Sequence, residues 1–171
     1  MEKQPCRIRD VLLVPTALVF IVFGASAVRA DETRCYTNAS LKGTYVAVAT
    51  YGANVALALA IRHLDGQGNL TGTFTLNAPD LASTTGGRKI ITGTQVGTYT
   101  VNCDGTGTFV RSLTSSTGVV ATQTDDFLIT QAKAEEDGQL LATALEDATR
   151  VPSALVPGGL FVFRSYTRRP D

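Results

Sequence analysis

Large and small side chains alternate along much of this chain, in short runs that turn residues separate. Residues 54–64 are the clearest case, because the larger apolar residues share one parity and alanines share the other. The larger ones are Val55, Leu57, Leu59 and Ile61. A period of two is typical of β-strands, whose successive side chains point to opposite faces. We expect a sheet with one crowded face here, and these larger residues could complete a dry core.

The stretch 96–110 adds a hairpin signal. Its sequence, VGTYTVNCDGTGTFV, places an Asn-Cys-Asp-Gly turn between two runs of high β propensity. Asn, Asp and Gly reach the positive φ values that tight hairpin turns require. Similar turn signals occur at residues 65–69 and 137–138. The chain therefore predicts a meander of β-hairpins.

The turn signals divide the chain into eight predicted strands. Their ranges are 43–51, 54–64, 70–76, 88–101, 107–113, 119–131, 139–145 and 160–166. Residues 131–149 also have helical propensity, but Gly138 would interrupt a helix and the hairpin spacing favours strands. Gly93 and Gly97 predict a bulge or a close approach inside the fourth strand. The expected fold is all-β: an eight-stranded antiparallel meander, as a sandwich or as a small closed barrel without exposed edges.

Residues 1–30 have the layout of a secretory signal peptide. Three basic residues precede an apolar run over residues 11–24, and small residues follow it. The run is short for a transmembrane helix, which needs about 20 apolar residues; an uncleaved anchor is the alternative. We expect cleavage after Ala30, or else after Ala27. The product would be a single β-barrel domain, residues 31–171, secreted or periplasmic and without a membrane span.

Two cysteines, Cys35 and Cys103, lie beyond the leader. An exported protein meets an oxidising compartment, so we expect them to form a disulfide. The alternative is a reactive thiol or metal pair, but no third or fourth ligand is spaced nearby. We therefore expect no metal and no cofactor.

Charge argues against a polyanionic partner. The leader holds four of the 15 basic residues and two of the 15 acidic ones, so the remaining domain is slightly acidic. Without a basic stripe, nucleic acid is not an expected partner.

Three segments carry a resemblance to known proteins. They are ASLKGTY from residue 39, LDGQGNLTG from residue 64 and GTYTVNCDGTGT from residue 97. Together they resemble a group of small exported bacterial proteins, usually uncharacterised, with an eight-stranded barrel similar to the calycin or allene oxide cyclase barrel. The resemblance covers most of the domain. It implies a fold and turn geometry, and it transfers no catalytic residue.

Few residues have the pattern of a catalytic site. His63 is the only histidine, and no nucleophile elbow accompanies it, so we place it at the mouth of the barrel. The spacing of Asp65, Gln67 and Asn69 suggests a calcium loop, but the required glycine and final glutamate are missing. The glycines of residues 104–107 lack the lysine and helix of a phosphate site. Both segments are expected to be turns.

Five residues are candidate contacts for a ligand in a barrel pocket: Tyr45, Tyr51, His63, Tyr99 and Asp126. Tyrosine combines an apolar body with a hydroxyl group, which suits a pocket wall. The adjacent Asp125 and Asp126 must point to opposite faces of a strand, and a solvent-exposed strand end is the alternative for both.

A carboxylate that faced inward would need a cationic partner such as Arg62, Arg111 or Arg164. These are the chain's candidate partners for a polar anchor inside the barrel.

The leading function hypothesis is the binding of a small apolar or amphipathic ligand, because an eight-stranded barrel can just enclose one. A cyclase or isomerase that templates a hydrophobic polyene by shape is the enzymatic alternative, based on fold analogy. A filled barrel with a structural or interaction role in the envelope is the third.

Overall fold

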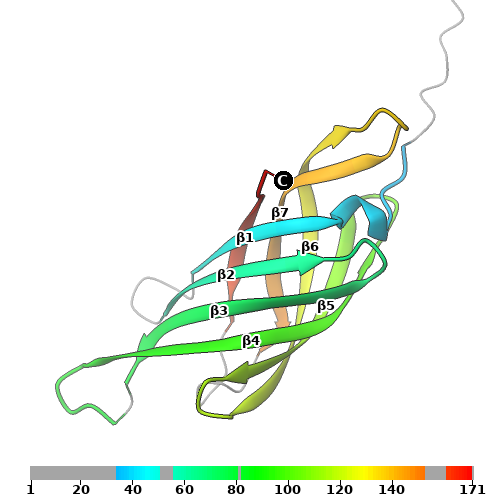
Figure 1. Ribbon diagram of the computed structural model, residues 1–171. Helices are drawn as coiled ribbons and strands as arrows, with labels where there is room; N and C mark the ends of the chain where they lie inside the picture. The colour runs from blue at the N-terminus through cyan, green and yellow to red at the C-terminus, as the bar shows by residue number, and fades with distance from the viewer. Residues whose placement is uncertain (1–33, 51–55, 81, 153–160, 171) are drawn as a thin grey trace, which may run out of the picture. The chain divides into compact units, whose positions relative to one another are not determined.

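The computed structural model describes residues 34–50, 56–80, 82–152 and 161–170, and these form a closed antiparallel β-barrel (Figure 1). A short 3-10 helix, η1 (Asn38–Leu41), precedes the strands. The strands are β1 (Gly43–Thr50), β2 (Leu57–Leu64), β3 (Asn69–Pro79), β4 (Arg88–Val101), β5 (Thr106–Ser115), β6 (Val120–Ala134), β7 (Leu140–Val151) and β8 (Phe163–Arg168). Each strand pairs with the next, and β8 pairs with β1. The predicted all-β, eight-stranded antiparallel barrel is confirmed, whereas the predicted signal peptide lies outside the described residues.

The region of mixed propensity after residue 131 is a β-hairpin. β6 continues to Ala134, and Glu135 N–H donates to the carbonyl of Gln139 at 2.8 Å to close the turn before β7. Gly138 occupies this turn with a φ of 83°, which disfavours other residues. The helical alternative is therefore wrong, and β7 extends six residues beyond its predicted end at 145, to Val151.

The two acidic turns are closed by their own side chains. The Asp65 carboxylate accepts hydrogen bonds from the backbone N–H groups of Gln67 and Asn69, at 2.7 and 3.0 Å. Asp104 accepts in the same way from the N–H of Thr106 at 3.0 Å. Such local bonds are the usual role of aspartate in turns. The structure thus shows both segments as hairpin turns.

The interior contains two apolar clusters with a charged layer between them. The cluster near η1, here called the aromatic end, includes Tyr45, Tyr99, Phe109, Phe127 and Tyr166. The cluster at the opposite ends of the strands, here called the alanine end, contains Ala49, Ala56, Phe74, Leu76, Ala78, Leu113 and Val162. Every strand therefore contributes at least one buried side chain to the interior.

Glycines let aromatic rings lie across the strands. A Cβ built on Gly93 would lie 2.5 Å from Cζ of Phe74, and one on Gly107 would lie 2.1 Å from Cζ of Phe127. Both distances are far shorter than van der Waals contact, so no larger residue fits without a shift of the ring. The close approach predicted at Gly93 is confirmed.

The parity of β2 differs from the expected dry core. Leu57 and Leu59 point outward and are 58% and 59% exposed, whereas the neighbouring alanines face the interior with Arg62. Other strands already fill the space that β2 faces with large side chains, namely Phe74 and two further arginines. Only the small side chains of β2 fit beside them. The large residues of β2 instead cover the outer surface beside Val48, which pairs with Leu59.

The N-terminal segment is attached to the β4–β5 turn. The sulfur atoms of Cys35 and Cys103 lie 2.14 Å apart, within disulfide-bonding distance, in agreement with the predicted pair. Tyr36 N–H donates to the carbonyl of Cys103 at 3.1 Å, and Asn38 Oδ1 accepts from the N–H of Val101 at 2.9 Å. These contacts hold η1 against one end of the barrel.

Candidate functional site

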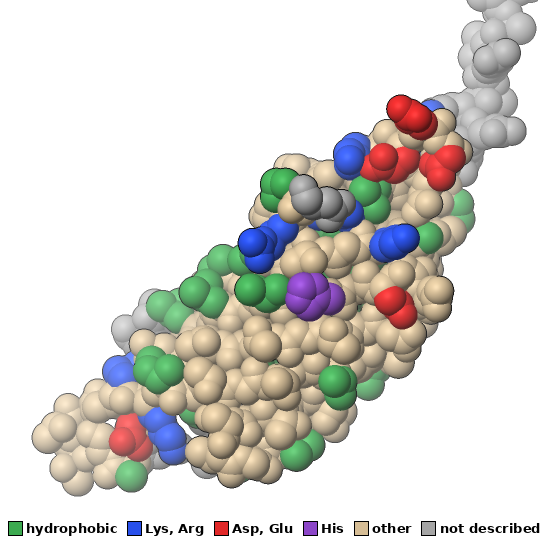
Figure 2. Space-filling view, viewed as in Figure 1, with side chains coloured by type: hydrophobic (Ala, Val, Ile, Leu, Met, Phe, Trp, Pro, Cys, Tyr) green, Lys and Arg blue, Asp and Glu red, His purple; other side chains and the backbone are tan. Residues whose placement is uncertain are grey.

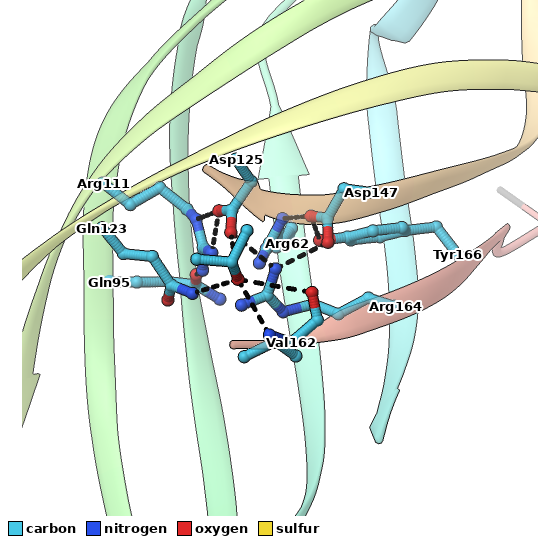
Figure 3. A network of polar contacts seen from close by, with 10 residues as sticks. Arg62, Gln95, Arg111, Gln123, Asp125, Asp147, Val162, Arg164 and Tyr166 are labelled. Atoms are coloured by element: carbon cyan, nitrogen blue, oxygen red, sulfur yellow. Dashed lines mark hydrogen bonds and ion pairs between the residues drawn. The ribbon is translucent and has the colours of Figure 1, made fainter. Parts of the chain in front are cut away.

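A layer of buried charged residues crosses the middle of the barrel (Figure 3). It contains three arginines and two aspartates: Arg62 on β2, Arg111 on β5, Asp125 on β6, Asp147 on β7 and Arg164 on β8. None of them is more than 4% exposed. Each lies at a strand position of inward parity, so the pleat of the sheet aims all five into the interior.

Asp125 is the most fully paired member of the layer. Its carboxylate accepts hydrogen bonds from Nε and Nη2 of Arg111, the first at 3.0 Å, and from Nη1 of Arg164, also at 3.0 Å. The Thr149 hydroxyl lies 3.1 Å from Asp125 Oδ1. Burial opposes ionisation of this carboxyl, but Arg111 and Arg164 outweigh burial and lower its pKa. Asp125 is therefore an ionised counter-ion for two arginines.

Asp147 connects the layer to the aromatic end. It accepts a hydrogen bond from Nη1 of Arg164 at 2.6 Å and another from the hydroxyl of Tyr166. Burial raises the pKa of Tyr166, so this hydroxyl keeps its proton and acts as a donor. The Tyr166–Asp147 bond thus closes the charged layer on the side that faces the aromatic end.

Arg62 is the least satisfied member. Its single hydrogen bond among the described residues is a long one, from Nη1 to Asp147 Oδ2 at 3.5 Å. Its Nε is buried without a hydrogen-bond partner there. The guanidinium lies over the rings of Phe109 and Tyr166, with its central carbon 5.2 and 4.7 Å from the ring centroids. Aromatic faces attract a cation but do not accept its directed hydrogen bonds as well as oxygen does.

The charges of the layer do not balance. Three arginines face two aspartates among the buried residues described, which leaves one excess positive charge. Burial and the neighbouring Arg111 lower the pKa of Arg62 to about 10. That value is still well above neutral pH, so Arg62 remains charged. A buried, uncompensated cation is costly unless an anion accompanies it.

A small cavity lies between the charged layer and the alanine end. Its volume is about 30 Å³. Its polar wall consists of Arg62, Gln95, Arg111, Gln123 and Arg164. Its apolar wall consists of Ala47, Ala49, Ala58, Leu59, Ala60, Phe74, Leu76 and Leu113. About 10–15 Å³ in this measure holds one water molecule, so the cavity has room for a group of a few heavy atoms.

The amide side chains of the cavity complete its polar wall. Gln95 Oε1 accepts from Nη1 of Arg111 at 2.9 Å, while its Nε2 is buried without a partner among the described residues. Gln123 Nε2 donates to the hydroxyl of Thr149 at 2.9 Å. Arg62 and Gln95 thus both border the cavity, and each has a buried donor without an acceptor in the described part of the chain.

The tyrosines proposed as pocket contacts lie elsewhere in the barrel. Tyr45 is buried at the aromatic end, where its hydroxyl donates to the carbonyl of Ala142 at 2.8 Å. The Tyr99 hydroxyl accepts from the N–H of Gly66 at 2.9 Å and donates to the carbonyl of Asn38 at 3.1 Å. Neither residue borders the cavity. Tyr51 lies outside the described residues.

The other two candidates are on the outer face. His63 is exposed, and its Nδ1 lies 2.9 Å from the hydroxyl of Thr44; the side chain is visible in purple in Figure 2. Asp126 forms a surface ion pair with Arg150 at 2.6 Å. The prediction that the two aspartates point oppositely is confirmed, but the inward one is Asp125. The sequence contains the reason, because Asp125 shares its parity with Phe127 and Ile129.

The arginines expected to pair with an inward carboxylate do so. Arg111 and Arg164 bind Asp125, whereas Arg62 reaches Asp147. Gln95, Gln123 and Asp147 were not predicted. Asp147 shares its parity with Leu145, which is the one local sign that it faces inward.

Comparison with protein-family models, with curated proteins and with solved structures finds no match for the chain. Within the described residues there is no group of three or more His, Cys, Asp and Glu side chains placed to hold a metal ion. In the same part of the chain, no helix has the length and hydropathy needed to span a membrane.

Proposed function

We propose that this barrel binds a small amphipathic molecule in the cavity between its charged layer and its alanine end. The observation that carries the proposal is the two-sided wall, with arginine and glutamine groups on one side and alanine and leucine side chains on the other. Ligand sites commonly combine an apolar lining with a few convergent polar groups. An amphipathic molecule satisfies both sides of this cavity at once.

The energetics of the charged layer support a binding role over a purely structural one. A buried ionic cluster contributes little net stability, since apolar residues of similar volume are often equally or more stabilising. The unbalanced charge and the unpaired donor of Arg62 make this layer less favourable still. A filled barrel with a structural or interaction role in the envelope remains the alternative, and the packed aromatic end favours it.

The size of the cavity limits the ligand. A cavity that accommodates benzene has a volume of about 150 Å³, several times the 30 Å³ present here. The site therefore suits a short molecule. A cyclase or isomerase of a polyene would need a wider barrel interior, so this enzymatic alternative is the weaker one.

The proposed setting is outside the cytoplasm. We propose that residues 1–30 are a signal peptide and that the barrel acts as a secreted or periplasmic bacterial protein. The pairing of Cys35 with Cys103 supports this setting, since disulfides persist in oxidising compartments. The proposed relationship to calycin-like or allene oxide cyclase-like barrels rests on the motifs and the strand order.

The test is a set of short probes that share a two-carbon skeleton: ethanol, acetamide, ethylamine and sodium acetate. Heteronuclear NMR of the barrel should show shifts of the amides of Ala58, Leu76 and Leu113 with at least one of them. Ala60→Val should weaken that binding about tenfold by filling the cavity. Ala148→Val, on the exposed outer face, is the matched control.

Two results would overturn the proposal. The first is that no probe shifts the amides around the cavity. The second is that Ala60→Val and the unmodified protein bind the same probe equally, because the binding site would then lie elsewhere.

A further inference from the structure

The cavity wall is cationic, and its cationic side chains are held in place by contacts behind them. Arg111 and Arg164 are both fixed by Asp125, and Arg62 lies against the rings of Phe109 and Tyr166. None of the three needs to move to present its guanidinium to the interior. This arrangement resembles a prepared receptor for negative charge, because fixed donors lose little conformational freedom on binding.

We propose, on the basis of the proposed binding function, that the ligand is a short-chain monocarboxylate whose carboxylate lies against Arg62 and Gln95. The two groups offer the buried donors that lack partners among the described residues, Arg62 Nε and Gln95 Nε2. A carboxylate has two acceptor oxygens and accepts hydrogen bonds from an arginine fork in two parallel directions. It would thus satisfy both orphan donors.

The net charge of the buried layer favours a ligand with a single negative charge. The layer has one more arginine than aspartate, so a monoanion makes the buried group neutral. A dianion such as phosphate would leave an excess negative charge of one in the same interior. A cation would raise the excess positive charge to two. Both are disfavoured, since a buried net charge is costly.

The other wall favours an organic anion over a halide. Four alanines from β1 and β2 border the cavity, together with Leu76 and Leu113. A short alkyl group would lie along this wall and remove apolar surface from water, which is favourable. A halide gains nothing there. The cavity volume restricts the alkyl group to one or two carbons.

The experiment compares acetate with ethanol on the full barrel at neutral pH and constant ionic strength, by NMR titration. Acetate should bind at least about tenfold more tightly, since hydrogen bonds to charged groups are worth more than neutral ones. Arg62→Met should abolish this preference. Arg150→Met removes an exposed arginine and is the matched control.

The possible outcomes separate the two proposals. Equal binding of acetate and ethanol would overturn the carboxylate inference and leave small-ligand binding standing. Displacement of acetate by chloride at equal concentration would also overturn it, because the site would then select anions without regard to the methyl group. Binding of neither probe would overturn the carboxylate inference, and the proposed function would fail as well if acetamide and ethylamine do not bind. The comparison on the unmodified protein decides the matter even if Arg62→Met does not fold.

Discussion

The two ends of the barrel interior are filled in different ways. At the aromatic end, Phe109 lies between Phe127 and Tyr166, with ring centroids 4.5 and 6.1 Å from its own. At the alanine end, β1 and β2 contribute small side chains, and a cavity remains between them and the charged layer. The same strands supply both ends, so the difference depends on side-chain size at alternate positions. One end is built to be packed, and the other leaves space beside three arginines.

The two ends also differ in how they contact the charged layer. The aromatic end provides ring faces and a tyrosine hydroxyl behind Arg62 and Asp147, which hold the charged layer from that side. From the alanine end, Gln95 and Thr149 bond to Arg111 and Asp125, and the cavity lies on this side of the layer. The charged layer therefore has a supported face and a face that borders the cavity.

The largest expected effect is at the packed end. Phe109→Ala should lower the free energy of unfolding by about 3–5 kcal/mol, since Phe109 is fully buried among other rings. Urea denaturation followed by far-ultraviolet circular dichroism would measure it. A loss below about 1 kcal/mol would show that the aromatic end is not the tightly packed region.

The neighbouring aspartates offer a matched pair for the charged layer. Asp125→Asn should cost about 3–5 kcal/mol, because Arg111 and Arg164 would lose their shared buried counter-ion. Asp126→Asn removes only a surface ion pair with Arg150 and should cost about 0.2–1 kcal/mol. Urea midpoints of the two variants would be compared. Equal losses would contradict the inward and outward placements.

An alanine-to-valine substitution at each end tests the difference in packing directly. Ala142→Val at the aromatic end should cost about 1–3 kcal/mol, because Ala142 is fully buried in a filled region. Ala60→Val at the cavity should cost less than about 1 kcal/mol, since the added methyl groups have space. Thermal melting of the two variants provides the measurement. If Ala60→Val destabilised the barrel more than Ala142→Val, the free space would lie at the aromatic end, which would contradict the structure.

The smallest effect concerns the tyrosine hydroxyls of the aromatic end. Burial raises the pKa of Tyr45 and Tyr166, and raises that of Tyr99 to about 12. Ultraviolet titration to about pH 11 should leave Tyr99 and Tyr166 protonated in the folded barrel, whereas an unfolded tyrosine ionises near pH 10. Stability should therefore fall as the pH rises above about 10, because the unfolded chain loses its tyrosine protons first. Complete ionisation of all tyrosines in the folded protein by that pH would contradict a dry aromatic end.

The sequence predicts most of the fold because its signals are local. Turn residues such as Asp65 and Asp104 bind their own loops, so each turn is readable from a few positions. Alternation likewise identifies the strands. It does not say which parity faces inward, and in β2 the larger residues proved to be outside.

The candidate site was harder to predict because its contacts join distant strands. The Arg62–Asp147 pair links residues 85 positions apart, and Arg164 on β8 reaches Asp125 on β6, 39 positions earlier. No local pattern specifies such pairs before the barrel closes. Tyrosines looked like pocket residues from their chemistry alone, yet backbone carbonyls take up the hydroxyls of Tyr45 and Tyr99.

The central claim is that Arg62 presents an unused donor to an anion inside the barrel. The most direct measurement is the NMR signal of the Arg62 Nε–H group, assigned by its loss in Arg62→Met, during titration with sodium acetate. The account predicts that this signal shifts and saturates with the amides of Ala58 and Leu113, while the Nε–H signal of Arg150 stays in place. Saturable acetate binding with an unmoved Arg62 signal would contradict it.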